Sequence, residues 1–261
     1  MQEFTYISSR ENSLIKLVSS LQTSAKTRRE NALFVLEGLR ICEDAYDNGI
    51  QFNKLIVSEN AKEKYVSEIE KFAKVCDNCY LLPENLFKKI SDTVSPQGII
   101  AVAKLPDTKG KTIDKKGRYI ALENLQDPSN LGAVARTAEA LGVSGIILSS
   151  NSCDPFSPKT LRASMGTLLR IPVIVLEDFA KEIKNTGLKI YSCVVEREAE
   201  SIENTAFSDG SVLVIGNEAN GITEEVKKIS DALITIRMSG KAESLNAAVA
   251  AAIAMWEMIK K

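Results

Sequence analysis

Histidine is absent from this chain of 261 residues. That absence excludes histidine-based catalytic triads, histidine general bases and histidine-ligated metals. The formal net charge of −1 provides no overall basic surface, so any binding of nucleic acid must come from local patches. The longest unbroken apolar run, residues 247–256, has ten residues, whereas a membrane span needs about 20. The start of the chain also lacks an apolar signal core, so we expect a cytoplasmic protein that does not enter a membrane.

Cysteine is scarce, and its pattern does not suggest a metal site. The five cysteines are an odd and scattered set, which suits a reducing compartment. Cys76 and Cys79 form a single C-x-x-C pair, but structural zinc needs four ligands and a second pair is missing. We expect residues 76–79 to form a turn that leads into the apolar residues 80–82, and we expect no metal in this protein.

The order of apolar and polar segments predicts two α/β domains. Residues 1–103 form the smaller domain, in which helix-like and strand-like segments alternate. The expected helices are residues 12–18, 23–30, 38–46 and 61–72, and the expected strands are 34–36, 54–57 and 99–102. Residues 104–117 are polar, contain proline and two glycines, and lack apolar periodicity, so they are predicted to be a linker.

Residues 118–261 contain six continuous apolar strand candidates separated mostly by helix-length stretches. These candidates are residues 119–122, 146–148, 173–176, 190–195, 212–215 and 232–236. Continuous apolar strands that alternate with helices indicate a parallel sheet covered on both faces. The second half is therefore predicted to be a doubly wound α/β domain.

Three short polar segments, each after a strand candidate, are the predicted site: residues 127–136, 216–221 and 238–246. Ligands of open α/β sheets bind at the carboxyl ends of strands. Each segment offers glycine or asparagine, where backbone turns tightly or approaches a ligand. Residues 216–221 have the glycine spacing of a P-loop, but Ile222 replaces the lysine that such a loop requires. The segments therefore predict a site for a small polar molecule, built largely from backbone and amides.

Individual side chains in these segments leave two interpretations open. A helix is expected over residues 132–141, with Asn130 at its N-terminal cap region. Arg136 lies about one turn into that helix, where it is either a phosphate-binding residue or a solvated surface arginine. Glu218 is either a surface carboxylate of a turn or a residue that faces a ligand or an arginine.

The last helix is expected over residues 243–259, in which thirteen of seventeen residues are apolar and lie all round its axis. A helix of this kind is buried. The helix is buried either inside one domain or partly in an interface between two copies of the chain. Because it lies at the end of the chain, the interface is at least as strongly favoured as burial inside one domain. We therefore expect a homodimer.

Together the three segments resemble the signature motifs of the SpoU (TrmH) branch of the SPOUT methyltransferases. The motifs are N-x-G-x-x-x-R-T-A at residues 130–138, G-N-E-x-x-G after the strand at 212–215, and I-x-M-x-G-x-x-x-S-L-N at 236–246. Residues 28–29, 34–38 and 93–98 resemble the ribosomal-protein-like substrate-binding domain that often precedes this fold. Two positions depart from the family pattern: Arg237 stands where proline is usual, and Ile222 replaces a common leucine.

The resemblance implies transfer of a methyl group from S-adenosylmethionine to a ribose 2′-hydroxyl of RNA, with ribosomal RNA favoured over transfer RNA. A non-catalytic RNA-binding protein of ribosome assembly is the alternative from another class. The resemblance also implies a trefoil knot in the C-terminal domain and supports the homodimer. The implied catalytic residues are Arg136, Asn130 and Glu218. The implied cofactor residues are Gly216, Asn217, Gly221, Ile236, Met238, Ser244, Leu245 and Asn246.

Without histidine, the proton of the 2′-hydroxyl needs another acceptor. A guanidinium pKa above about 12 makes Arg136 a poor base. We therefore expect Arg136 to hold the adjacent phosphate and to stabilise the developing alkoxide, while the proton passes to that phosphate or to water. RNA binding is predicted at basic stretches in residues 8–40 and 157–170, with solvated helix faces as the alternative. The predicted RNA contacts are Lys26, Arg28, Arg29, Lys159 and Arg162.

Overall fold

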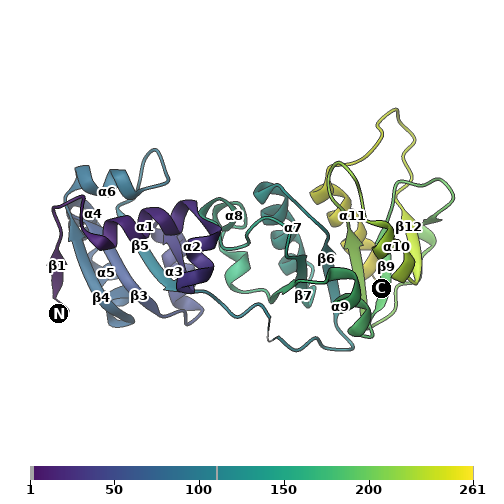
Figure 1. Ribbon diagram of the computed structural model, residues 1–261, viewed down its shortest axis with the longest axis horizontal. Helices are drawn as coiled ribbons and strands as arrows, with labels where there is room; N and C mark the ends of the chain where they lie inside the picture. The colour runs from purple at the N-terminus through teal and green to yellow at the C-terminus, as the bar shows by residue number, and fades with distance from the viewer. Residues whose placement is uncertain (1–2, 110, 261) are drawn as a thin grey trace. The chain divides into compact units, whose positions relative to one another are not determined.

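Two compact units make up the chain in a computed structural model that describes residues 3–109 and 111–260 (Figure 1). The N-terminal unit runs to Pro106 and also contains Phe156–Leu169, and the C-terminal unit contains Asp107–Pro155 and the chain from Arg170 onward. This division differs in one place from the contiguous domains expected from the sequence. Phe156 belongs to the N-terminal unit because its buried ring packs on Phe34, with ring centroids 5.5 Å apart.

The N-terminal unit is built on a five-stranded mixed sheet, in the order β1-β4-β3-β5-β2. The strands are β1 (Phe4–Tyr6), β2 (Leu33–Glu37), β3 (Phe52–Ser58), β4 (Cys76–Leu82) and β5 (Ile99–Lys104). β5 runs antiparallel to both of its neighbours, β2 and β3, and the other pairs are parallel. Residues 105–109 and 111–117, which follow β5, form neither helix nor strand.

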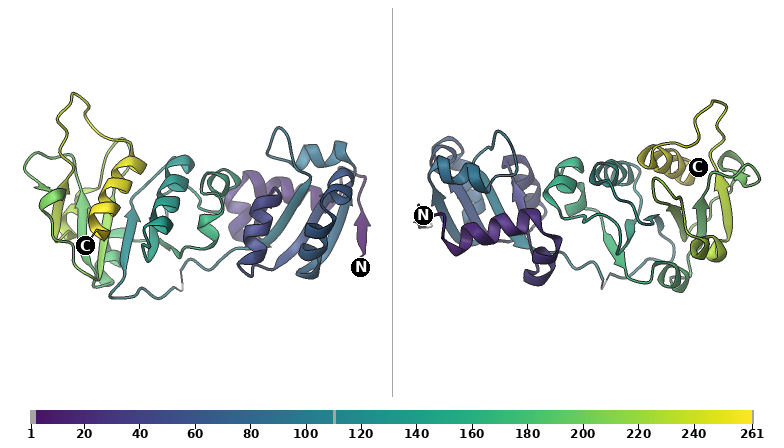
Figure 2. Two further views of the ribbon diagram at one scale, coloured as in Figure 1. Left: turned by 180° about the vertical axis from the view of Figure 1, so that it is seen from behind. Right: turned by 45° about the horizontal axis from the view of Figure 1, so that its top comes forward.

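Helices cover both faces of this sheet (Figures 1 and 2). The helices are α1 (Ser13–Thr23), α2 (Ala25–Asn31), α3 (Leu39–Asp47), α4 (Glu59–Lys64), α5 (Val66–Lys74) and α6 (Glu84–Ile90). Apolar residues of α1 and α6 share one core with Ile56 and Ile100 of the sheet. On the opposite face, Phe72 of α5 packs edge-on against Phe52 of β3, with ring centroids 5.7 Å apart.

Two local expectations for the N-terminal unit were wrong, and two elements were missed. The single helix expected over residues 61–72 is interrupted at Tyr65, which leaves the helical conformation (φ −118°, ψ 47°) and separates α4 from α5. The expected turn at residues 76–79 is instead the start of β4, because Cys76 and Cys79 are buried and pair with β3. β1 and α6 were not expected at all.

The C-terminal unit confirms the predicted parallel sheet. Its seven strands lie in the order β10-β12-β9-β11-β6-β7-β8, and every neighbouring pair is parallel. They are β6 (Arg118–Leu122), β7 (Gly145–Ser149), β8 (Val173–Leu176), β9 (Lys189–Cys193), β10 (Glu200–Ser201), β11 (Ser211–Ile215) and β12 (Ala232–Thr235). Short β10 was not expected.

Helices lie on both faces of this sheet as well (Figure 1). Phe179 and Ile183 of α9 (Phe179–Asn185) and Val226 of α10 (Glu224–Ile229) share a core with the sheet on one face. On the other face, α7 (Pro128–Ala140) packs along α11 (Ala247–Ile259), and α11 contacts β11 and β6. The remaining helix, α8 (Pro158–Ala163), lies in the segment that belongs to the N-terminal unit. Within the residues described, none of the helices is long and apolar enough to cross a membrane.

The last helix is shorter and less buried than the sequence suggested. α11 begins at Ala247, and Asn246 is its N-cap. The buried positions of α11 are Ala247, Ala251, Ala254, Met255 and Met258. Val249, Ile253 and Trp256 are exposed in the single chain. Their spacing of four and three residues forms one apolar stripe along the helix, so α11 buries one face within its own unit and leaves another open.

Candidate functional site

A cavity of about 420 Å³ lies at the carboxyl ends of β9, β11 and β12. It is lined by the ends of these strands and by residues that follow them: 193–196, 215–222, Ile236, Met238 and 243–245. This is the edge of a parallel sheet at which ligands bind. With the exception of Asn246, every predicted cofactor residue lines it: Gly216, Asn217, Gly221, Ile236, Met238, Ser244 and Leu245.

The loop after β11 is closed by its own backbone. Asn217 and Gly221 each donate their N–H to the carbonyl of the other at 2.9 Å. The side-chain oxygen of Asn217 accepts from the N–H groups of Ala219 and Asn220 at 2.9 and 3.2 Å. A Cβ at Gly216 would lie 2.1 Å from the carbonyl carbon of Gly221. The loop therefore requires glycine at position 216 and presents backbone to the cavity.

A chain of hydrogen bonds joins the three motif segments beside this cavity. The side-chain N–H of Asn246 donates to Oδ1 of Asn130 at 3.0 Å, and Nδ2 of Asn130 donates to Oε1 of Glu218 at 2.9 Å. Asn130, in the middle of this series, is buried at 8% exposure, whereas Glu218 and Asn246 at its two ends are exposed. Asn246 also caps α11 by accepting from the N–H of Ala248 at 2.9 Å. The three segments therefore form one site.

The structure corrects the expected start of the helix that carries Asn130. α7 begins at Pro128, and its N-cap is Asp127, whose side chain accepts from the N–H of Ser129 at 2.8 Å. Asn130 therefore lies within the first turn rather than at the cap. Its side chain does not cap the helix and instead forms hydrogen bonds with Glu218 and Asn246.

Glu218 is held in its charged form. Partial burial acts to raise its pKa, but hydrogen bonds from the Asn130 amide and from the backbone N–H groups of Gln126 and Asp127 outweigh that effect and lower the pKa. Glu218 is therefore ionised at neutral pH. By contrast, burial raises the pKa of the nearby Cys153 thiol to about 12, with Glu218 and Asp127 adding to the shift. Cys153 is therefore a neutral thiol at neutral pH and a poor nucleophile.

Arg136 does not line the cavity of its own chain. It lies six residues after Asn130 in α7, which places it about 240° round the helix axis and about 9 Å along it. The residue is exposed and points about 120° away from the buried Asn130 around the axis of α7. The structure thus brings Asn130, Glu218 and the predicted cofactor segments together, and it places Arg136 apart from them.

A buried carboxylate that the sequence interpretation missed supports the loop at residues 216–221. Glu123 directly follows β6 and is 4% exposed. Its Oε2 accepts from the N–H of Thr223 at 2.8 Å, and its Oε1 accepts from the hydroxyl of Thr223 at 2.7 Å. Thr223 is the N-cap of α10 and ends the loop that lines the cavity. The signal in the sequence was a charged residue at the carboxyl end of an apolar strand.

Two further charged residues at the cavity were missed. Nζ of Lys227 lies 2.9 Å from Oε1 of Glu196, and both residues line the cavity. Hydrogen bonds to Glu196 and then to Glu224 raise the pKa of Lys227. These residues follow β9 or lie in α10, outside the three motifs, so the motif pattern did not point to them.

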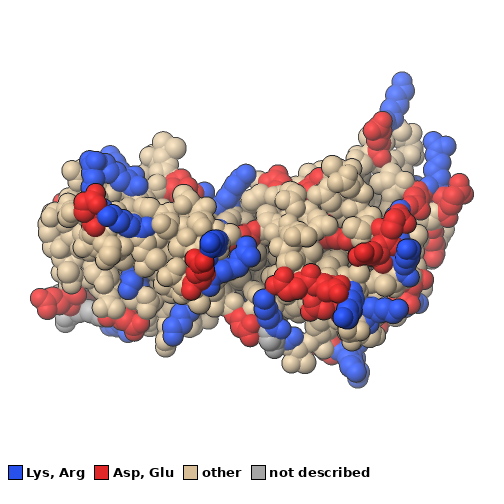
Figure 3. Space-filling view, in the orientation of Figure 1, with Lys and Arg blue, Asp and Glu red and all other residues tan. Residues whose placement is uncertain are grey.

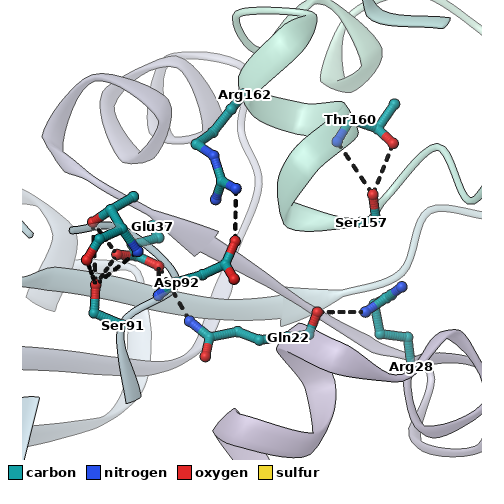
Figure 4. Close-up of polar contacts among 9 residues, drawn as sticks. Gln22, Arg28, Glu37, Ser91, Asp92, Ser157, Thr160 and Arg162 are labelled. Atoms are coloured by element: carbon teal, nitrogen blue, oxygen red, sulfur yellow. Dashed lines mark hydrogen bonds and ion pairs between the residues drawn. The ribbon is translucent and has the colours of Figure 1, made fainter. Parts of the chain in front are cut away.

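The predicted RNA contacts are divided by the structure. Lys26, Arg29 and Lys159 are exposed. Arg28 is only 3% exposed, and its guanidinium donates to the carbonyls of Leu21 and Gln22 at the end of α1 (Figure 4). This placement does not suit a phosphate contact, because the guanidinium is used to cap a helix. Arg162 is exposed and pairs with Asp92 at 2.6 Å.

Comparison with known proteins identifies the family. The model of the SpoU rRNA Methylase family matches residues 117–256, and the model of the MRM3-like substrate binding domain matches residues 12–101. The chain therefore belongs to the SpoU rRNA methylase family. The 23S rRNA (guanosine(2553)-2′-O)-methyltransferase RlmP of Bacillus subtilis is 31% identical to it, over 97% of this chain and 98% of the relative.

Solved structures agree with this family. An rRNA methyltransferase from Sinorhizobium meliloti has a TM-score of 0.86 and 27% identity, with 98% of both chains covered. The AdoMet-bound structure of an rRNA methyltransferase from the same organism has a TM-score of 0.85 and 29% identity, covering 98% of this chain and 97% of the other. The chain is an S-adenosylmethionine-dependent RNA methyltransferase.

The residues that line the cavity are chemically suited to S-adenosylmethionine. Ile236, Met238 and Leu245 provide apolar walls against which a purine can pack. Backbone groups of the loop at residues 216–221 can pair with polar edges of the ligand, and the ionised Glu218 at the cavity favours a positive sulfonium. Among residues 3–109 and 111–260, no group of three or more His, Cys, Asp or Glu side chains could hold a metal ion.

Replacing Glu123 with alanine is expected to lower the free energy of unfolding by about 2–4 kcal/mol, because hydrogen bonds to charged groups contribute about 1.5–3 kcal/mol each. Affinity for S-adenosylmethionine should fall about tenfold or more, since Thr223 then no longer fixes the end of the loop. Urea unfolding and calorimetric titration measure the two effects. The matched control is the exposed Glu198→Ala, and equal behaviour of the two variants would contradict the assigned role.

Proposed function

We propose that the protein transfers the methyl group of S-adenosylmethionine to a ribose 2′-hydroxyl of ribosomal RNA. The observation that carries this proposal is the pair of hydrogen bonds from Asn246 to Asn130 and from Asn130 to Glu218, which links the three motif segments at one cavity. The near full-length similarity to a methyltransferase named for 23S rRNA favours ribosomal RNA as the substrate. The N-terminal unit, which matches a substrate-binding domain, fits a large structured RNA.

The reaction needs positioning more than acid–base chemistry. The cofactor, when bound, supplies a methyl carbon made electrophilic by the sulfonium, and an in-line displacement then depends mainly on alignment. We assign the loop at residues 216–221 and the segment at 236–245 to holding the cofactor. Glu218 is a weak base because its pKa is lowered, so Glu218 and Asn130 orient the reactants. Arg136 holds the adjacent phosphate and stabilises the alkoxide, and the proton passes to that phosphate or to water.

We propose a homodimer to account for the position of Arg136. The open stripe of α11, formed by Val249, Ile253 and Trp256, lies on the helix that packs along α7. A second copy that covers this stripe would meet the exposed side of the same helix pair, where Arg136 lies. We propose that Arg136 of one copy acts at the cavity of the other copy. The reason is that Arg136 does not line the cavity of its own chain.

Trp256→Glu is expected to convert the protein into a monomer, because it places a charge in the middle of the apolar stripe. Light scattering after size-exclusion chromatography at micromolar concentration gives the mass. Methyl transfer should be lost together with the dimer. Val66→Glu, which adds the same charge to an exposed apolar position of the N-terminal unit, is the control. A monomeric wild-type protein at that concentration would contradict the homodimer.

The chain path after β12 supports the implied trefoil knot. β12 lies near one edge of the sheet, yet the following segment leads to α11, which contacts β11 and β6 in the middle of the sheet. The knot remains a proposal that rests on the family and on this return of the chain. We also keep the cytoplasm as the proposed location, since ribosomal RNA is modified where ribosomes are assembled.

Mapping of 2′-O-methylation in total RNA, from cells with and without the gene, tests the substrate. We expect one ribosomal nucleotide to lose its methyl group when the gene is deleted. Loss from a transfer RNA would instead favour the alternative, which is also suggested by a Synechocystis relative named as an uncharacterized tRNA/rRNA methyltransferase, 28% identical over 96% of this chain. Failure of the pure protein to bind S-adenosylmethionine in a titration would favour the non-catalytic alternative.

A further inference from the structure

The loop of residues 91–98, between α6 and β5, is anchored at its start to one carboxylate. Glu37 at the end of β2 accepts hydrogen bonds from the Ser91 hydroxyl, from the Thr93 hydroxyl at 2.7 Å and from the N–H of Asp92 at 2.8 Å (Figure 4). The amide of Gln22 adds a fourth donor at 3.2 Å. Four donors on one partly buried carboxylate hold the first three residues of the loop in one conformation.

The other end of the loop is fixed as firmly. The side-chain oxygen of Gln97 accepts from the N–H of Leu39 at 2.9 Å, and the N–H of Ser58 donates to the carbonyl of Gly98 at 2.9 Å. Gly98 has a φ of 81°, and a Cβ there would lie 2.3 Å from the Ser58 hydroxyl. This end therefore depends on a glycine, whose backbone lies close to the side chains of Ser58 and Ala61.

The tip between these anchors points into solvent. Val94 has a relative exposure of 103%, so its side chain is fully presented to solvent among the residues that the structure describes. Its neighbour Ser95 is also exposed, and residues 94–96 carry no charge. Anchored ends reduce the ordering entropy that a loop loses when it binds a partner. Because Val94 is exposed, it adds nothing to the core of the protein. A loop that is fixed at both ends and presents an apolar residue to water is suited to binding a partner.

The surroundings of the tip are basic. Lys88 and Lys89 are exposed in the last turn of α6, directly before the loop, and Arg40 is exposed beside the helix end that Gln97 caps. Figure 3 shows basic side chains gathered over α6 beside the protruding loop. The two acids at the loop base are occupied, since Glu37 receives four donors and Asp92 pairs with Arg162.

We infer that the loop of residues 91–98 is a contact site for unpaired nucleotides of the RNA substrate. Val94 packs on the face of an exposed base, and Lys88, Lys89 and Arg40 contact the flanking phosphates. Structured RNA is recognised chiefly at unpaired bases, with cations on the backbone. A protein partner would need an apolar surface far larger than one valine. This inference rests on the proposed RNA substrate and names the part of the N-terminal unit that holds it.

Photo-crosslinking tests the contact directly. A benzophenone amino acid replaces Val94 in the full-length protein, and the control carries it at Val66, which is also exposed in the N-terminal unit. The probe is ribosomal RNA extracted from cells that lack the gene. We expect crosslinks to RNA from position 94 several times more often than from position 66. Equal yields at the two positions, or crosslinks from position 94 in a lysate that go to protein alone, would overturn the inference.

Steady-state kinetics supply the second test. Val94→Asp is expected to raise KM for the same RNA about tenfold, by losing the base contact and repelling phosphate, with little change in kcat. Its affinity for S-adenosylmethionine should equal that of the wild type, and Val66→Asp should leave all three values unchanged. Val94→Phe should bind RNA at least as tightly as the wild type, since an aromatic ring stacks on a base.

The salt dependence of RNA binding separates the cations from the apolar tip. A double variant, Lys88→Ala with Lys89→Ala, should lower the slope of log affinity against log salt by about 1–2. If the wild-type protein methylates RNA but Val94→Asp behaves like Val66→Asp, the proposed RNA contact of the loop is refuted. The proposed function is then unaffected. Absence of methyl transfer by the wild type on any RNA would refute the proposed function itself.

Discussion

Replacing Arg136 with alanine is expected to slow methyl transfer about a hundred- to a thousandfold. Loss of a charge-assisted contact to the phosphate or to the developing alkoxide costs about 2–4 kcal/mol of transition-state stabilisation. Cofactor affinity should stay unchanged, because Arg136 lies outside the cavity of its own chain and is assigned to the phosphate of the RNA rather than to the cofactor. Single-turnover methylation and a matched cofactor titration measure the two quantities. Near-normal turnover in the variant would return Arg136 to the role of a surface arginine.

Two further variants define how Arg136 acts. Arg136→Lys should rescue the rate only partly, because an ammonium cannot provide the forked geometry of a guanidinium. Mixed dimers test whether the residue works across the proposed interface. A protein with Arg136→Ala, mixed and refolded with one that carries Asn246→Ala, should regain part of the activity, since one cavity of a mixed dimer then has both groups. Failure of the mixture to exceed the separate variants would place Arg136 at its own cavity.

The turn at residues 216–221 was predictable because the chemistry that forms it is local. Gly216, Asn217 and Gly221 form a turn whose requirements are contained in six consecutive residues. The parallel sheet was predictable as well, since buried strands such as β11 carry an unbroken apolar run, here residues 212–215. In both cases the sequence near each residue determines its structure.

Other features depend on residues that are distant in the sequence. Arg28 looks like a surface cation in a basic stretch, yet it turns inward to carbonyls of the preceding helix. Glu123 meets Thr223 one hundred residues later. Phe156 leaves the C-terminal half to pack on Phe34. Each of these placements depends on tertiary packing, which the pattern of neighbouring residues does not predict.

The second large effect is expected at Gly216. A Cβ there would lie 2.1 Å from the carbonyl carbon of Gly221 and 2.3 Å from the backbone nitrogen of Ile222. Backbone atoms cannot move aside as a flexible side chain can, so Gly216→Ala must open the loop that closes through Asn217 and Gly221. We expect affinity for S-adenosylmethionine to fall at least about a hundredfold, which corresponds to about 2.7 kcal/mol.

Gly240→Ala is the matched control for this variant. Gly240 belongs to the third motif, but a Cβ at that position meets no atom within 4 Å, and its φ is not positive. Affinity should therefore stay within about threefold of the wild type, a change of less than about 1 kcal/mol. Circular dichroism of both variants separates loss of the loop from loss of the fold. If Gly216→Ala bound the cofactor as well as Gly240→Ala does, the closed backbone turn would not be what shapes the cofactor site.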